Sequence, residues 1–412
     1  MRRPLALASL FTAMAFTASA CGGTASTGSG ADDGRGWKQI VSDASGQTVD
    51  LWMYGGDERG NSYVDDVLAP AAKKLGVTLR RVPVADTKDA LRRILAQKAA
   101  GKASGDVDLI WVNGDTFSTG RQADAWYCGW ASKLPNMKYV AKGDPLVSED
   151  FGTSVDGCES PWHKAQFTFA YDSAKVQEPP QSFDDLLTWA RAHPGRFTYP
   201  APPDFTGSVF VRQALYAASG GAANVPRQFA QGDFDQLTPA LWKSLEDLNP
   251  SLWREGRTYP RDEAALNRLY ADGEVDFTMT YGPATLTDLV DKGTFPATTR
   301  VLALEDGTVG NASFLGIPST STDRDGAMVV ANLALSPEQQ AAKADPAVWG
   351  QFPALDLDLL DAADRARFEE LPKSEVVPSF DVLSKNAKPE LSSSWVTPLD
   401  EGWRRQVLGA GS

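Results

Sequence analysis

Runs of apolar residues separated by amphipathic stretches predict that strands and helices alternate along this chain. The short segments 49–54, 77–82 and 107–112 are predicted strands, and 107–112 is nearly continuous in apolar residues, as expected of a buried parallel strand. The intervening segments, 63–75 and 86–100, repeat apolar residues at helical spacing. This strand, helix, strand order predicts a doubly wound α/β lobe.

A second series of alternating elements follows the proline-rich residues 178–180. The predicted strands of the remaining chain are 167–171, 197–199, 275–281, 300–304 and 313–317, and the predicted helices are 206–219, 238–248, 262–272, 326–335 and one that begins at Ser182. We therefore predict two doubly wound α/β lobes. We assign residues 46–170 and 300–340 to lobe 1, and residues 171–299 and 341–412 to lobe 2.

The first twenty residues have the pattern of a secretory signal peptide. Arg2 and Arg3 precede an apolar run, 4–16, and small residues follow up to Ala20. The run is shorter than the roughly 20 residues that a transmembrane helix needs. We assign 1–20 to a signal peptide.

The next residue, Cys21, ends an Ala-Ser-Ala-Cys sequence that resembles a lipobox, in which the cysteine is diacylated and becomes the N-terminus. Two acyl chains would anchor the protein stably at the outer face of the membrane. The alternative is simple cleavage after Ala20, which leaves Cys21 as a free thiol. Residues 22–36 lack large apolar side chains, and we assign 21–45 to a flexible, lipid-anchored leash.

Composition narrows the class of protein. The chain has 412 residues, 42% of them hydrophobic, with 12 tryptophans, which indicates well-packed globular lobes. Its formal net charge of -13 argues against nucleic-acid binding, because an acidic surface repels phosphate backbones. Cys128 and Cys158 form an even pair in an oxidising compartment, and we predict a disulfide between them; two buried free thiols are the alternative.

The sequence offers little for catalysis. It contains only two histidines, His163 and His193, and no H-E-x-x-H, G-x-S-x-G, P-loop or G-x-G-x-x-G motif. We therefore expect no enzymatic activity, no metal and no cofactor. Paired carboxylates among the 53 acids leave one enzyme alternative, an exported glycan hydrolase. An adhesive lipoprotein without a solute site is a third alternative.

Four glycine-containing turns follow predicted strands and open helices, where open α/β sheets bind ligands. Ordinary helix caps are the alternative for each turn. The candidate ligand-binding residues are Tyr54, Gly55, Gly56, Asn61, Asn113, Asp115, Phe205, Thr206, Gly207 and Tyr281, together with Trp162, which we place in a loop at 160–163. Trp52 and Trp111 lie inside predicted strands, and we expect them in the core.

Several of these segments resemble a known family. Residues 108–117 (DLIWVNGDTF), 171–176 (YDSAKV) and 194–207 (PGRFTYPAPPDFTG) are similar, in this order, to the YnjB-like group of bacterial extracellular solute-binding proteins. The resemblance implies a type II periplasmic-binding-protein-like fold, in which two α/β lobes joined by a multi-strand hinge close on a ligand. The Gly55-Gly56 turn with Asn61, Asn113-Gly114, Pro161-Trp162 and Phe205-Thr206-Gly207 match the family pattern.

The resulting functional expectation is the extracellular solute-binding component of an ABC importer. We expect a monomer that captures a small polar solute between its lobes and delivers it to a permease and its ATPase. The sequence leaves a cationic, a sugar-like and a phosphate-bearing solute open.

Overall fold

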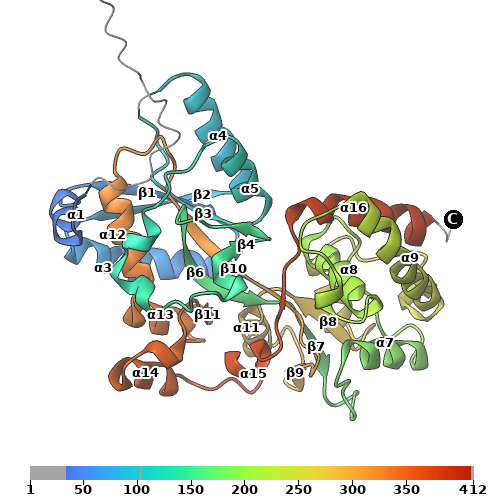
Figure 1. Ribbon diagram of the computed structural model, residues 1–412. Coiled ribbons are helices and arrows are strands. Elements are labelled where there is room, and N and C mark those ends of the chain that lie inside the picture. Colours follow the sequence, from blue (N-terminus) through green and yellow to red (C-terminus); the bar gives the residue numbers. More distant parts are fainter. Residues whose placement is uncertain (1–33, 103, 410–412) are drawn as a thin grey trace, which may run out of the picture.

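The computed structural model describes residues 34–102 and 104–409. The predicted signal peptide and the predicted lipidation site, Cys21, lie outside these residues. The described chain forms two α/β bodies that lie side by side, joined by strands that run from one to the other (Figure 1). We call the body that contains β1 lobe 1 and the body that contains β7 lobe 2.

Lobe 1 is built on a seven-stranded mixed sheet. Its strand order is β11-β6-β10-β3-β1-β2, and β12 pairs with β10 outside this path. The strands are β1 (Thr48–Tyr54), β2 (Thr78–Val84), β3 (Leu109–Val112), β6 (Glu159–Gln166), β10 (Val309–Gly316), β11 (Phe352–Pro353) and β12 (Lys388–Pro389). β2 and β3 pair with β1 in parallel, whereas β10 runs antiparallel to both β3 and β6. A short hairpin of β4 (Glu149–Asp150) and β5 (Thr153–Ser154) lies apart from this sheet.

Helices cover both faces of this sheet, so successive strand residues belong to different cores. In β3, Leu109 packs in the core beneath α1 and α12, and Ile110 packs in the opposite core beneath α4. This alternation explains why β3 is apolar throughout. The helical segments of lobe 1 are α1 (Trp37–Asp43), α2 (Glu58–Ser62), the π-helical turn η1 (Tyr63–Leu68), α3 (Ala69–Lys74), α4 (Thr87–Ala99), α5 (Asp115–Gln122), α6 (Pro145–Ser148), α12 (Arg324–Ala334), α13 (Pro337–Ala344) and α14 (Ala362–Glu369).

Lobe 2 has a smaller sheet of three strands in the order β8-β7-β9, both pairs antiparallel. They are β7 (Thr168–Asp172), β8 (Phe277–Thr280) and β9 (Thr299–Val301). One aromatic-rich core joins the sheet to the surrounding helices. These helices are α7 (Phe183–Ala192), α8 (Phe205–Ala218), α9 (Gln231–Leu248), α10 (Glu263–Ala271), α11 (Ala284–Asp291) and α16 (Ser393–Trp403). The short α15 (Phe380–Ser384) lies between the lobes, where Phe380 packs on Phe352 of β11.

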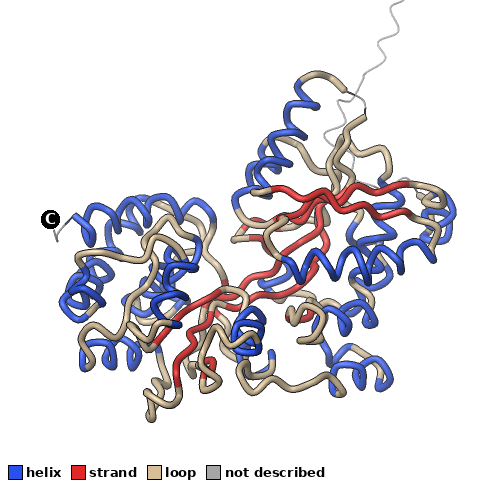
Figure 2. The backbone as a smooth tube through the Cα atoms, turned by 180° about the vertical axis from the view of Figure 1, so that it is seen from behind, coloured by secondary structure: helices blue, strands red, loops and turns tan. Residues whose placement is uncertain are grey.

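Three stretches of chain connect the lobes. β6 continues into β7, β9 leads back into β10, and residues 384–393 carry the chain from α15 to α16. Figure 2 shows the strands as one continuous band between the two bodies. The third stretch is fixed to lobe 2 by Glu390, which forms a buried double hydrogen bond with Arg212 of α8 (2.7 and 3.0 Å). These crossings form a multi-strand hinge.

Three sequence-based expectations were wrong in detail. The leash assigned to 21–45 is wrong in its last part, because α1 packs against α12 and buries Ile40. Residues 197–199 are buried but form no strand, and the prolines that follow lack the amide hydrogens a sheet ladder needs. The stretch that begins at residue 341 was assigned to lobe 2, yet Trp349 packs in a core of lobe 1.

Candidate ligand-binding site

The strand directions bring the candidate turns of the two lobes to facing edges. β10 begins at Val309 in the core of lobe 2 and runs antiparallel to β3, so the carboxyl end of β3 points toward lobe 2. β1 is parallel to β3 and ends on the same edge with Tyr54. In lobe 2, Thr280 at the end of β8 pairs with Thr168 at the start of β7, directly after the hinge. The segments that follow β1, β3 and β8 therefore face the space between the lobes.

The first turn, after β1, is braced from within. Asn61 donates a hydrogen bond from Nδ2 to the Gly55 carbonyl (2.9 Å). Asp57 caps α2 by accepting from the Gly60 amide (3.0 Å), and its second oxygen accepts from the Trp349 indole (2.8 Å). The candidate Asn61 therefore holds the shape of the turn with its amide group.

The second turn, after β3, depends on a glycine. Gly114 has φ 58° and ψ -126°, a conformation that strains any residue with a Cβ. Its amide donates to Asp150 (2.7 Å), which is 1% exposed, and burial raises the pKa of that carboxyl to about 7. Burial and the nearby Asp150 also raise the pKa of Glu159. The candidate Asp115 opens α5, is exposed, and forms an ion pair with Lys88 (3.4 Å).

The third turn opens α8, the long buried helix of lobe 2. Asp204 caps this helix by accepting from the Gly207 amide (3.0 Å). A Cβ at Gly207 would collide with the Pro200 carbonyl oxygen, so only glycine fits there. The Thr206 hydroxyl donates to Glu263 (2.6 Å), a carboxyl group whose pKa is raised by burial. Thr206 and Gly207 thus shape the turn from inside.

Phe205, at the first position of α8, behaves differently, because 49% of it is exposed. Its ring meets the ring of Tyr281 with centroids 5.2 Å apart. Tyr281 follows β8, is only 8% exposed, and belongs to the core of lobe 2. Burial, together with the nearby Glu390, raises the pKa of the Tyr281 hydroxyl. Tyr281 therefore supports Phe205 from behind.

The prediction that Trp162 lies in a loop was wrong. Trp162 is fully buried in β6 and packs edge-on against Trp111 and Trp349 at centroid distances of 5.3 Å. His163 joins this cluster, and burial lowers its pKa well below the usual value. Sequence patterns do not predict this cluster, because its members come from three separate segments. Trp111 packs partly buried in a core of lobe 1, as expected.

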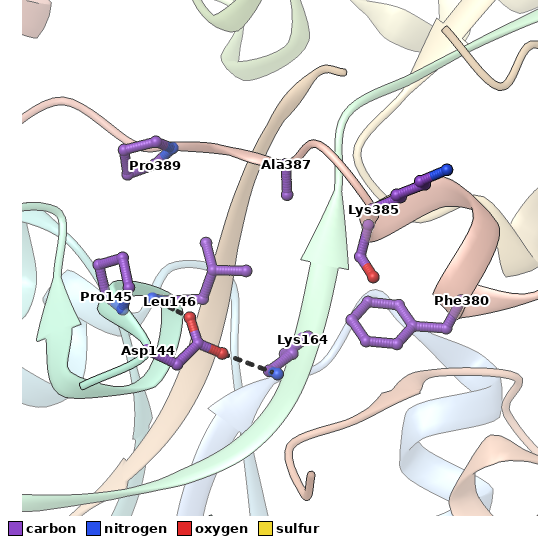
Figure 3. Close-up of a pocket in the computed structure, with 9 residues that line it drawn as sticks. Asp144, Pro145, Leu146, Lys164, Phe380, Lys385, Ala387 and Pro389 are labelled. Carbon is purple, nitrogen blue, oxygen red and sulfur yellow. Dashed lines mark hydrogen bonds and ion pairs between the residues drawn. The ribbon is translucent and has the colours of Figure 1, made fainter. Parts of the chain in front are cut away.

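A separate pocket lies beside the hinge and not at the candidate turns. It has a volume of about 240 Å³, and its walls come from the start of α6, from β6 and from residues 380–389. Figure 3 shows Lys164 paired with Asp144 in this pocket (3.0 Å), with the Phe380 ring close to Lys164. None of the candidate ligand-binding residues lines it.

Three further observations concern the described residues. A disulfide joins Cys128 to Cys158, and the Arg121 guanidinium lies 2.7 Å from the Cys158 sulfur. Within residues 34–102 and 104–409, no helix is long and apolar enough to cross a membrane. In the same residues, no three or more His, Cys, Asp or Glu side chains form a group that could hold a metal ion.

Comparison with known proteins agrees with this geometry. Residues 66–366 match the family described as bacterial extracellular solute-binding protein. The protein YnjB of Escherichia coli strain K12 is 37% identical over 368 residues, which cover 89% of this chain and 92% of that protein.

The fold also resembles solved structures. An ABC transporter structure from Clostridium perfringens matches with a TM-score of 0.61 at 16% identity, covering 88% of this chain and 100% of that one. An ABC transporter substrate-binding protein from Bradyrhizobium japonicum matches with a TM-score of 0.61 at 18% identity, covering 87% and 99%. One conclusion follows from the two-lobed fold with facing turns, the family match over most of the chain and this relative. The chain belongs to the bacterial extracellular solute-binding protein family.

Proposed function

We propose that this protein is the solute-binding component of an ABC importer, which captures a small polar solute between its lobes and delivers it to a membrane permease and its ATPase. The observation that carries the proposal is the convergence of turns from both lobes on one interlobe space, across a hinge of three chain crossings. The solved structures named as an ABC transporter and as an ABC transporter substrate-binding protein share this fold.

Hinge closure accounts for ligand capture in this proposal. A solute that touches both lobes makes its full set of contacts only when the lobes close, so its binding favours the closed state. Two ion pairs already join the lobes, Arg59 with Asp288 (2.7 Å) and Arg227 with Glu149 (2.6 Å). Such pairs, partly exposed to solvent, are each worth about 0–1 kcal/mol, which leaves the hinge equilibrium responsive to a ligand.

The candidate residues divide into two groups in this proposal. Tyr54, Asn113, Asp115 and Phe205 stand at the facing edges and would contact the solute. The other candidates, Gly55, Gly56, Asn61, Trp162, Thr206, Gly207 and Tyr281, would shape and support the turns. Binding and release require no catalytic residue.

The location belongs to the same proposal. We place the protein outside the cytoplasm as a monomer, held at the outer face of the cell membrane by a lipid on Cys21. The family match supports the extracytoplasmic location. Replacement of Cys21 by Ser should release the protein from membranes or leave an unprocessed precursor, and unchanged membrane fractionation would exclude the anchor.

Thermal unfolding of the full chain with a panel of sugars, amino acids, oxyanions and organic cations tests solute capture. A ligand present at 100 times its Kd should add about 2.7 kcal/mol of stability. Small-angle scattering should show a more compact protein with that ligand. Asn113→Ala and Asp115→Ala should each weaken binding by about one to two decades in Kd, as expected for the loss of a hydrogen bond to a desolvated ligand.

A matched control separates ligand contacts from helix caps. Asp361 caps α14 through the Asp364 amide, away from the facing edges. Asp361→Ala should lower folding stability and leave affinity unchanged. Should Asn113→Ala and Asp115→Ala behave as this control does, or should no compound stabilise the protein, the proposal fails.

A further inference from the structure

Exposed aromatic rings single out the two edges that face each other between the lobes. Among the phenylalanines, tyrosines and tryptophans that the structure describes, only Tyr54 and Phe205 are exposed, at 45% and 49%. Tyr54 ends β1 in lobe 1, and Phe205 begins α8 in lobe 2. Rings of this size that stay exposed to water forgo the favourable free energy of burial. One such ring on each of two facing edges therefore indicates a bound partner.

Each ring is held in place on one side and open on the other. The Tyr54 side chain folds back over the Gly55-Gly56 turn so closely that a Cβ on Gly56 would collide with its hydroxyl. Phe205 rests against Tyr281, which is itself anchored in the core of lobe 2. Rings fixed in this way lose little conformational entropy when a ligand stacks on them.

The charges around the same turns favour a cation. Residues 54–59, 113–116, 204–208 and 281–283 contain four acids, Asp57, Glu58, Asp115 and Asp204, against one base, Arg59. Arg59 is paired with Asp288 (2.7 Å) and Asp115 with Lys88 (3.4 Å), so Asp57, Glu58 and Asp204 are the acids of these turns that form no ion pair among the described residues. Acidic side chains around a partly enclosed space raise the local concentration of positively charged solutes.

The helix starts at these turns are poorly suited to an anion. The Gly114 amide, before α5, already donates to Asp150, and the Gly207 amide in α8 donates to Asp204. A phosphate or carboxylate would approach helix starts that carry a carboxyl group of their own. One amide at each of these two helix starts is therefore already occupied within the protein, which reduces its availability to an anion.

Together these observations define the class of solute, and the inference rests on the function proposed above. We propose that the solute is an organic cation whose flat or methylated positive group is held between the Tyr54 and Phe205 rings when the lobes close. Aromatic faces attract such a group through their negative quadrupole, and the attraction grows as water is excluded. The acids of the turns supply the long-range attraction.

Calorimetry with the full chain tests this assignment. The probes are choline, thiamine and spermidine as cations, 3,3-dimethylbutanol as an uncharged analogue of choline, and glucose and inorganic phosphate. We expect at least one cation to bind. Tyr54→Leu and Phe205→Leu, which keep an apolar side chain but remove the ring, should each weaken its binding about 2- to 30-fold. If that cation is choline, the uncharged analogue should bind at least about tenfold more weakly.

Leu75→Ala serves as the matched control, because it removes exposed apolar surface from the end of α3 (44% exposed). It should leave binding unchanged, and circular dichroism should show that all three variants are folded. Binding of glucose or phosphate in place of every cation, or full affinity in both ring variants, would overturn the solute class while leaving solute capture intact. Binding of no probe and no other compound of the wider panel would overturn both proposals.

Discussion

A buried carboxyl beneath the Asn113–Asp115 turn should make the stability of this protein fall as pH rises. Asp150 accepts a hydrogen bond from Gly114, and its other oxygen is buried without a partner. Burial raises its pKa from the usual 3.8 to about 7. Asp150→Asn keeps the acceptor for the Gly114 amide and removes the ionisation, so it isolates this effect.

The direction and size follow from proton linkage. Between pH 3.8 and about 7 the folded state keeps the proton that the unfolded state has released, so folding weakens as pH rises. The gap of about three pH units corresponds to roughly 4 kcal/mol at 1.36 kcal/mol per unit. Below pH 3.8 the difference disappears, because both states are protonated. The free energy of unfolding of Asp150→Asn should therefore match that of the natural protein at pH 3.5 and exceed it increasingly up to pH 7.5.

Urea unfolding followed by tryptophan fluorescence at pH 3.5, 5, 6 and 7.5 measures this difference. Glu178→Gln, which removes an exposed carboxylate far from the turn, is the control and should show no comparable trend. Because burial and the nearby Asp150 raise the pKa of Glu159, Glu159→Gln should show a change of the same sign. Parallel pH profiles for Asp150→Asn and the natural protein would refute the reasoning.

Three further predictions concern other contacts. Replacing Cys128 and Cys158 by Ser should lower the free energy of unfolding by about 3–4 kcal/mol, because the bond closes a loop of 30 residues; urea titration of both forms checks this, and mass spectrometry of the natural protein should find no free thiol at either position. Arg212→Met should cost about 3–5 kcal/mol by leaving Glu390 as an unpaired buried charge, and adding Glu390→Leu should recover most of that loss in urea titrations. Gly207→Ala should cost about 1–3 kcal/mol through its collision with a backbone carbonyl, seen as a lower midpoint of thermal unfolding.

Most of the elements were predictable because their signals are local. β1 buries Val49, Leu51 and Met53 on alternate positions, and the helix predicted from Ser182 begins at Phe183 with Ser182 as its cap. Spacing and capping depend on residues a few positions apart, so the sequence alone specifies them. The same holds for the three turns that follow β1, β3 and β8, whereas the turn that opens α8 follows residues 197–199, which form no strand.

The roles of individual turn residues were not predictable, because their partners are far away in sequence. The Thr206 hydroxyl donates a hydrogen bond to Glu263, 57 residues later. The Trp349 indole donates one to Asp57, from which it is 292 residues away. Trp162 was predicted in a loop because β6 has the sequence ESPWHKAQ, in which a proline and five polar residues leave no apolar strand pattern.

The sequence by itself determined that the chain forms two α/β lobes with glycine-containing turns after their strands, because hydrophobic periodicity and backbone restrictions act locally. Only the tertiary structure decided which turn residues face the other lobe and which support the turn from within. Tyr54 and Phe205 remain exposed. Asn61 and Thr206 instead form hydrogen bonds within the protein, and Tyr281 packs behind Phe205. The physical reason is that a side chain's exposure and hydrogen-bond partners are set by segments brought beside it in three dimensions, and no short stretch of sequence contains them.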